Sequence, residues 1–284
     1  MSSIAITSTA FGLQAILIIP LLVLGVSSAR NVKKNGDQAR RGIIWFHAGF
    51  WLFFMSLFLS TISWSFTLAG FSGSWYHDYG QWEAASHIES VGSFFAYLAY
   101  IAIMVCIAEL AMGVKLVTNQ VESNKFSVFI RVLSAIATVL WVTCFIFTEV
   151  RLASYYRSGV ELAYFIIAIV FLSCLVIGAI SVTVFTFIQR RTTRRVDAGV
   201  DAQTGNFLAI TVVLFLISIL WSVVMGVLFG FVFSLWWYEF AIPEVFLRRW
   251  LISAILFLIY RLGRKKTGGL WSNTTSAPKD SDIE

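Results

Sequence analysis

Charged residues are scarce in this sequence, and their scarcity excludes a soluble globular protein. Lys, Arg, Asp and Glu together make up 13% of the 284 residues, whereas hydrophobic residues make up 58%. The mean hydropathy of +0.82 is far above what a soluble domain needs to fill its core. The sequence therefore predicts a chain that folds within a lipid bilayer and has the bilayer as a partner.

Cysteine is rare as well. Cys106, Cys144 and Cys174 all fall inside apolar segments, so neither a disulfide framework nor a thiolate metal site is expected. A phosphate-binding loop, a HExxH helix, histidine pairs and paired aspartates at membrane depth are also missing. These absences argue against a metal-dependent or diphosphate-ionising enzyme, and no cofactor is expected.

Signatures of familiar seven-helix proteins are absent. The last apolar segment has no lysine to form a retinal Schiff base, which excludes a rhodopsin pigment. It also lacks an Asn-Pro-x-x-Tyr motif, and residues 109–115 show no acidic-Arg-aromatic triplet, so the common receptor signatures are not found. No internal repeat is visible, and an inverted-repeat transporter is therefore not supported.

Long apolar runs dominate what is present. Because about 20 apolar residues cross a bilayer, the sequence predicts seven membrane spans in an all-α bundle. The runs cover residues 11–28, 43–68, 88–112, 128–148, 162–188, 207–233 and 241–262. The first run has no basic region before it and is predicted to be a retained span rather than a signal peptide. Residues 1–262 form the predicted transmembrane domain, and residues 263–284 form a disordered cytosolic tail.

Basic residues are distributed unevenly between the predicted loops. Those on one side carry the clusters 30–41, 115–131 and 190–195, whereas the opposite loops carry only Arg151 and Arg157. By the positive-inside rule, the N-terminus lies outside or in a lumen and the C-terminus in the cytosol. The sequon at Asn273 is then cytosolic and is expected to stay unmodified. Topology and anionic lipid explain the net charge of +6, so nucleic acid is not an expected partner.

A few ionisable side chains lie at membrane depth, where each costs about 2.5–3.5 kcal/mol. Near the predicted outer face, Glu244 and Arg248 are expected to pair along one helix face. Arg249 then needs a carboxylate from another helix, either Glu149 or Glu89. The residues expected to form one polar cavity are Glu89, Glu149, Arg151, Glu244, Arg248 and Arg249. A purely structural ion pair is the alternative for each of them.

Two further ionisable residues lie near the predicted cytosolic face. His47 and Glu109 are each about one turn inside neighbouring spans, and a contact between them is predicted. Glu109 and Glu89 are separated by about 200° around one helix, so they face nearly opposite sides. Only one of these acids can be central to a single pocket, and small residues on both faces leave the choice open.

Aromatic residues make up 16% of the chain. Much of this content is expected to be bulk that faces lipid. Rings that line a dry pocket also stabilise a cation, by about 0.5–2 kcal/mol each. The aromatic content is therefore compatible with a site for cationic intermediates.

The chain resembles a known family. Its seven predicted spans, short loops, brief polar tail and segments 106–113 and 148–152 resemble small integral membrane proteins of fungal secondary-metabolite clusters. Within these, it looks most like the membrane-bound terpene cyclases of the ascofuranone type. The resemblance implies cyclisation of a prenyl chain, often epoxidised and attached to an aromatic or polyketide head, that is started by protonation without a metal. The implied partner is thus a hydrophobic prenylated small molecule.

Such chemistry needs an acid that donates a proton to an epoxide oxygen or an olefin, and burial favours the protonated form of a carboxyl group. The candidate acids are Glu89, Glu149 and Glu109. The candidate substrate-binding residues are Arg151, Glu244, Arg249 and His47.

We therefore expect a metal-independent terpene cyclase, an isomerase or lyase, in a secretory-pathway membrane such as the endoplasmic reticulum. The alternative is a seven-helix receptor or a lipid-translocating protein without catalytic activity. Short loops argue mildly against a signalling receptor. The apolar middle layers of the spans argue against a translocation path.

Overall fold

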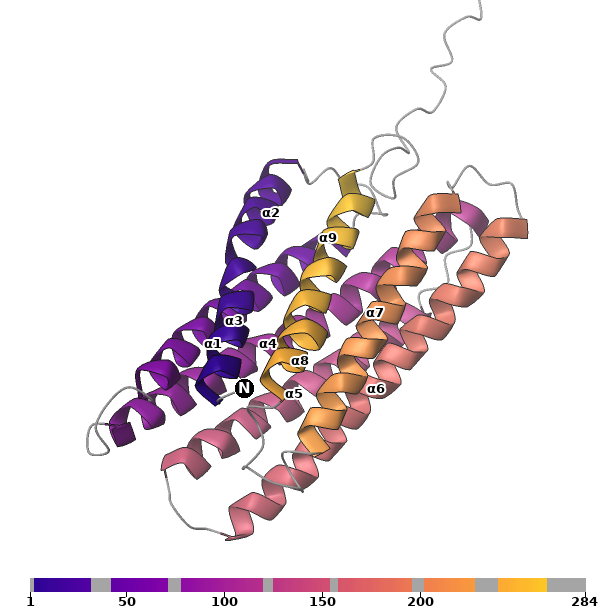
Figure 1. Cartoon of the computed structure of the whole chain (residues 1–284). Helices are drawn as coiled ribbons and strands as arrows, with labels where there is room; N and C mark the ends of the chain where they lie inside the picture. The colour runs from indigo at the N-terminus through magenta and orange to yellow at the C-terminus, as the bar shows by residue number, and fades with distance from the viewer. Residues whose placement is uncertain are drawn as a thin grey trace, which may run out of the picture.

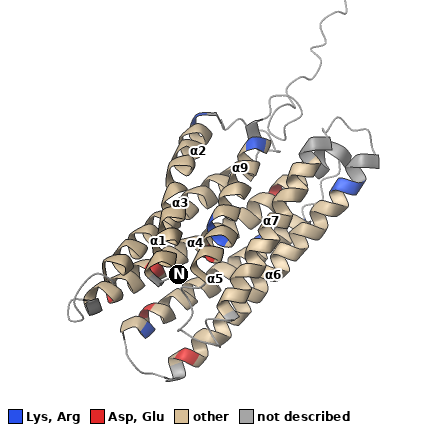
Figure 2. Cartoon of the chain, viewed as in Figure 1, with Lys and Arg blue, Asp and Glu red and all other residues tan. Residues whose placement is uncertain are grey.

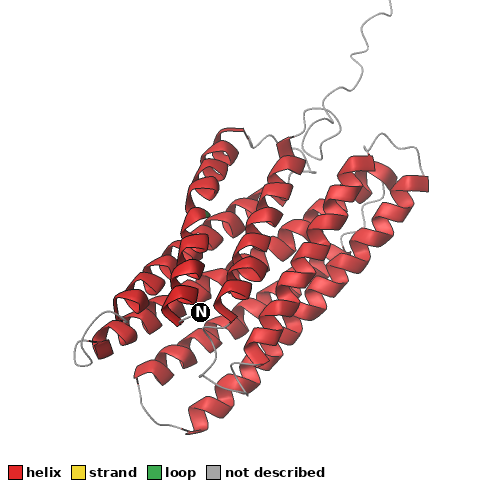
Figure 3. Cartoon of the chain, viewed as in Figure 1, coloured by secondary structure: helices red, strands yellow, loops and turns green. Residues whose placement is uncertain are grey.

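The computed structural model describes residues 3–31, 42–70, 78–119, 125–153, 158–195, 202–227 and 240–264. Within these ranges the chain is helical apart from a turn at Leu17, and no strand occurs. The helices form one elongated bundle (Figures 1 and 3). The predicted all-α class is confirmed for this part of the chain. The predicted disordered tail was residues 263–284. Gly263 and Arg264 belong instead to the last helix, and residues 265–284 lie outside the described residues.

Six helical segments are long and apolar enough to cross a membrane: Ile4–Arg30, Gly42–Gly70, Gly80–Gly113, Lys125–Ala153, Val160–Arg191 and Gly205–Gly226. The first comprises α1 (Ser3–Ile16) and α2 (Ile18–Asn31). The others belong to α3 (Gly42–Gly70), α4 (Asp78–Asn119), α5 (Lys125–Ala153), α6 (Ser158–Arg195) and α7 (Ala202–Val227). These helices define an integral, multi-pass membrane protein.

A last helical segment comes after α7 in the described chain. It consists of α8 (Ala241–Glu244), the π-helical turn η4 (Val245–Trp250) and α9 (Leu251–Arg264). Its bounds agree with the predicted run 241–262, but Glu244, Arg248 and Arg249 make its first part much less apolar than the other segments. Length and composition therefore support six spans directly, against the seven that the hydropathy pattern predicts. Figure 2 shows how few charged residues lie along the helices.

The first span is broken at Leu17, which the hydropathy pattern did not predict. Pro20 explains the break, because proline has no N–H to bond the carbonyl of Ile16 and its ring crowds that carbonyl. At the break, the Leu17 N–H bonds to the carbonyl of Gln14, three residues back rather than four, at 3.1 Å. The Gln14 side chain donates to Thr61 Oγ1 of α3 at 3.1 Å, so the bend is held against the neighbouring helix.

Helix α4 is the centre of the bundle. It contacts α3, α5, α6 and α7, and every side chain from Ala99 to Met112 is buried. Gly92 permits its close approach to α3, because a Cβ atom there would lie 3.4 Å from the backbone nitrogen of Ser60. The helix begins at Asp78 rather than at the predicted position 88. Hydropathy marks only the part inside hydrocarbon, whereas residues such as Gln81 and Glu83 favour helix without being apolar.

Candidate functional site

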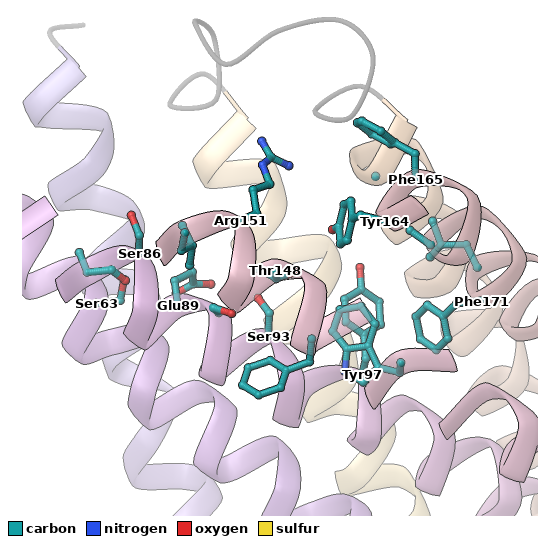
Figure 4. A pocket seen from close by; sticks show the side chains of 18 of the residues that line it. Ser63, Ser86, Glu89, Ser93, Tyr97, Thr148, Arg151, Tyr164, Phe165 and Phe171 are labelled. Atoms are coloured by element: carbon teal, nitrogen blue, oxygen red, sulfur yellow. The ribbon is translucent and has the colours of Figure 1, made fainter. Parts of the chain in front are cut away.

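A cavity of about 700 Å³ lies at the end of the bundle where α3, α5 and α7 end and α4 and α6 begin (Figure 4). This is the end that the charge distribution predicts to face outward. The lining comes from α3, α4, α5 and α6, with Gly226 of α7 and Arg248 of η4. Residues from both halves of the sequence therefore meet at this site.

One face of α4 supplies much of the lining. Ser86, Glu89, Ser93 and Tyr97 succeed one another along the helix at intervals of three or four residues, which places them on one side. Figure 4 shows this row beside the cavity. It continues to Trp82, which belongs to the part of α4 that precedes the predicted span. The early start of the helix thus extends the site.

Three aromatic rings from three helices pack together along the lining. Tyr97 of α4 and Trp141 of α5 have ring centroids 4.3 Å apart, and Trp141 and Phe171 of α6 are stacked at 4.9 Å. The Trp141 indole N–H donates to the Phe94 carbonyl at 3.0 Å, which fixes its orientation. This aromatic cluster of Tyr97, Trp141 and Phe171 gives the cavity a rigid, polarisable surface.

Glu89 is the one carboxylic acid among the described residues that line the cavity. It accepts a hydrogen bond from Ser60 Oγ at 2.8 Å and lies 3.6 Å from Arg249 Nη2. Arg249 is 3% exposed and also donates to the hydroxyls of Ser56 and Ser60, at 2.8 and 3.0 Å. Of the two carboxylates that the sequence predicted as partners of Arg249, Glu149 and Glu89, the structure brings Glu89 to it. The side chain of Glu89 is 37% exposed, so its carboxyl group is accessible from the cavity side.

Glu244 and Arg248 form the second predicted pair. Arg248 Nη1 donates to Glu244 Oε1 at 2.8 Å, and the Trp221 indole N–H donates to Glu244 Oε2 at 2.7 Å. The Arg248 guanidinium lies 5.0 Å above the ring of Tyr97. Its Nε and Nη2 atoms are buried and have no hydrogen-bond partner among the described residues. Arg248 lines the cavity, and two of its donor atoms are unused.

Glu149 does not appear in the cavity lining, although Thr148 and Arg151 on either side of it do. Its Oε2 atom lies 2.9 Å from Nδ1 of His87 on α4. Arg151 lines the cavity with a side chain 52% exposed, and its Nε lies 3.9 Å from Glu161 Oε1. An ion pair of this length at an exposed position contributes little to stability.

Glu109 lies toward the other end of α4 and away from the cavity. It is buried and accepts hydrogen bonds at Oε1 from Ser127 Oγ at 2.6 Å and from Arg131 Nε at 2.9 Å. Arg131 Nη2 donates to the same atom at 2.6 Å. The ring of His47 lies 5.4 Å from that of Phe46, and its predicted contact with Glu109 stays a prediction. Of the two acids on α4, Glu89 is the one at the cavity.

Several residues that line the cavity or pair with the candidate acids were not predicted from the sequence. His87 lay before the predicted span, and Tyr97 was one aromatic residue among many. Arg131 was interpreted only as a marker of topology. A detectable pattern was the row of buried hydroxyls on α3, whose spacing of four, three and four places them on one helix face. These residues are Ser56, Ser60, Ser63 and Thr67.

No family model and no curated protein matches the sequence, and no solved structure matches its fold. The described residues also contain no group of three or more His, Cys, Asp or Glu side chains placed to hold a metal ion. The class that the structure defines is thus a multi-pass, all-helical membrane protein with a polar and aromatic cavity at one end. The geometry of this cavity is the basis for the function that we propose below.

Proposed function

We propose that the protein is a metal-independent terpene cyclase that protonates a terminally epoxidised prenyl chain inside this cavity. The observation that carries the proposal is the carboxyl group of Glu89 at a cavity whose other walls are largely aromatic and apolar. The volume of about 700 Å³ lies within the range of about 300–1,000 Å³ that small-molecule sites occupy. A prenylated aromatic compound is a ligand of suitable size and polarity.

Glu89 is the proton donor in this proposal. Transfer of its proton to the epoxide oxygen breaks a C–O bond, and a neighbouring double bond supplies electrons to the carbon that becomes cationic. Ser60 and Arg249 stabilise the carboxylate that remains after the proton has left. Loss of a proton from the last carbocation gives an isomer of the substrate. No redox partner is needed.

The aromatic cluster stabilises the carbocation that forms after Glu89 has donated its proton. The faces of Tyr97, Trp141 and Phe171 stabilise positive charge on the carbon chain by about 0.5–2 kcal/mol per ring. Because these rings pack closely, they also keep water from the cation. Arg151 is a candidate for binding the substrate at the exposed rim. Arg249 does not bind the substrate itself but holds Glu89, and Glu244 likewise holds Arg248.

The membrane topology that accompanies this function has seven spans, with the N-terminus outside or lumenal and the C-terminus cytosolic. The last helical segment supports a seventh span because its charges have partners within the bundle: Glu244 with Arg248, and Arg249 with Glu89. Beyond them, Ile252, Ile255 and Ile259 of α9 are buried in the core. The asymmetry of basic residues supports the orientation. The proposed location is a secretory-pathway membrane, such as the endoplasmic reticulum.

Product analysis tests the catalytic proposal. Membranes that contain the protein are incubated with a terminally epoxidised farnesyl-phenol, and the extract is examined by mass spectrometry. We expect a new product of unchanged mass that Glu89→Gln abolishes. Glu83→Gln is the matched control, since Glu83 is exposed on the same helix and does not line the cavity.

A second measurement separates the cyclase from a receptor or translocating protein. Binding of the same compound is measured by quenching of tryptophan fluorescence, since Trp82 and Trp141 line the cavity. Binding without conversion by well-folded protein would contradict the cyclase and favour the receptor or transport function.

A further inference from the structure

The most unusual group in the cavity is the guanidinium of Arg248. Its side chain is 13% exposed, yet it uses only Nη1 for a hydrogen bond to Glu244. The Nε and Nη2 atoms are buried without a hydrogen-bond partner among the described residues. Buried donors that find no acceptor cost free energy, so an arrangement of this kind is expected where a ligand supplies the acceptor.

We infer that Arg248 anchors a carboxylate head group of the substrate, which identifies the substrate class as a prenylated acid. The two unused N–H groups, on Nε and Nη2, form one edge of the planar guanidinium. They are parallel and match the two oxygens of a carboxylate, which a lysine ammonium does not. The inference rests on the proposed function for the use of the cavity as a substrate site.

The position of Arg248 is fixed before a ligand arrives. Glu244 holds the opposite edge of the guanidinium, and Trp221 in turn holds Glu244 at 2.7 Å. The ring of Tyr97 supports the guanidinium plane from 5.0 Å. A donor pair with this support loses little conformational entropy on binding, so its hydrogen bonds discriminate well between head groups.

The charges of the lining favour an anion. Arg151 and Arg248 line the cavity, and Glu89 is the one acid among the described lining residues. The described lining thus holds two cationic side chains and one acidic side chain. Arg248 is the better anchor of the two arginines, because Arg151 is half exposed and water weakens its contacts.

The apolar part of the ligand has a matching surface. Tyr97, which lies under Arg248, belongs to the aromatic cluster with Trp141 and Phe171. A head group on Arg248 therefore places the first isoprene units against these rings. Ser90 also lines the cavity, and its buried hydroxyl has no partner among the described residues.

Ligand binding tests the anchor independently of turnover. The probes are a farnesylated benzoic acid and its methyl ester, which share a tail and differ in head-group charge. Their dissociation constants are measured with purified protein in lipid nanodiscs by quenching of tryptophan fluorescence. We expect the acid to bind about tenfold to a hundredfold more tightly than the ester, the range typical of a charge-assisted pair of hydrogen bonds.

Two variants examine Arg248 itself. Arg248→Lys keeps the charge and the partner of Glu244 but removes the parallel donors. The double variant Glu244→Gln with Arg248→Gln removes both charges, so that no buried carboxylate is left unpaired. We expect both to bind acid and ester within about twofold of each other, whereas Arg151→Gln keeps most of the preference for the acid. Gel filtration and thermal unfolding without ligand establish that each variant is folded.

The outcomes separate the two proposals. Equal binding of acid and ester by the wild-type protein, or an undiminished preference in both Arg248 variants, overturns the anchor. Failure of both probes to bind overturns the anchor and the substrate site together. A preference for the acid that depends on Arg248 supports the anchor even if no cyclised product forms, in which case only the catalytic proposal fails.

Discussion

The guanidinium of Arg249 lies 3.6 Å from the carboxylate of Glu89, and it connects the last helical segment to the central helix α4. The same guanidinium donates to Ser56 and Ser60 of α3. One side chain thus joins three parts of the bundle beside the cavity. Because it is buried, its loss affects both the stability of the helix packing and the state of the candidate acid.

Removal of either partner should destabilise the protein, and removal of both should cost less than the sum. Glu89→Gln leaves a buried guanidinium without its counter-charge, and Arg249→Gln removes the cation from beside Glu89. We expect each single variant to lower the free energy of unfolding by about 1–3 kcal/mol, less than for a fully buried pair because Glu89 is partly exposed. A double-mutant cycle from thermal unfolding in detergent measures the coupling.

The exposed pair of Arg151 and Glu161 is the control for this cycle. Its atoms are 3.9 Å apart and both side chains are about half exposed. We expect a coupling energy below about 1 kcal/mol, which added salt reduces further. Equal coupling energies in the two cycles would show that Arg249 and Glu89 do not form a buried ion pair.

Glu109 should be a structural acid rather than a catalytic one. It is buried and holds Arg131 and Ser127 of α5, far along α4 from the cavity. We expect Glu109→Gln to lower stability by about 1–3 kcal/mol while the rate per folded molecule changes by less than about twofold. Turnover normalised to folded protein, compared with Glu89→Gln, measures the difference. If Glu109→Gln lost as much turnover as Glu89→Gln, the assignment of Glu89 rather than Glu109 as the proton donor would be contradicted.

Trp141 should control the fate of the cation. In Trp141→Leu the ring face is lost, so we expect turnover to fall about 2- to 30-fold and products trapped by water to increase. Trp141→Phe keeps a ring and should restore most of the cyclised product. Mass spectrometry distinguishes the isomer from the hydrated product. Trp51→Leu, at an exposed position on α3, is the control and should leave the product ratio unchanged.

The proposed orientation predicts where glycans attach. The sequon at Asn273 should remain bare because it is cytosolic, whereas a sequon added ahead of Ser3 should be glycosylated. Expression in microsomes and subsequent endoglycosidase digestion show each glycan as a shift on a gel. A glycan on Asn273 would reverse the orientation.

Local spacing and hydropathy predicted part of this architecture. The pair of Glu244 and Arg248 is expected from their positions on one helix, and Arg249 was expected to reach either Glu89 or Glu149. The structure selects Glu89 because the hydroxyls of Ser56 and Ser60 complete the donor and acceptor set around Arg249. The six apolar segments were predicted from runs that fill the thickness of the bilayer.

Contacts that depend on tertiary packing escaped prediction. His87 meets Glu149 because α4 continues as a helix beyond its apolar part, which hydropathy does not report. Arg131 meets Glu109 across the interface of two helices, although its position near a loop had indicated topology alone. The break at Leu17 is caused by Pro20, whose effect within a long apolar run is invisible to hydropathy.

The π-helical turn η4 has a consequence for how this segment tolerates insertions and deletions. The Leu251 N–H bonds to the Phe246 carbonyl, five residues back instead of four, so the turn holds one residue more than an α-helix would. Each residue added to or removed from a helix rotates the remainder of that helix by about 100°. The charged first turn and the apolar α9 are therefore set in phase by a single extra residue. Deletion of one residue here would turn the buried face of α9 toward lipid, although no residue that lines the cavity had been substituted.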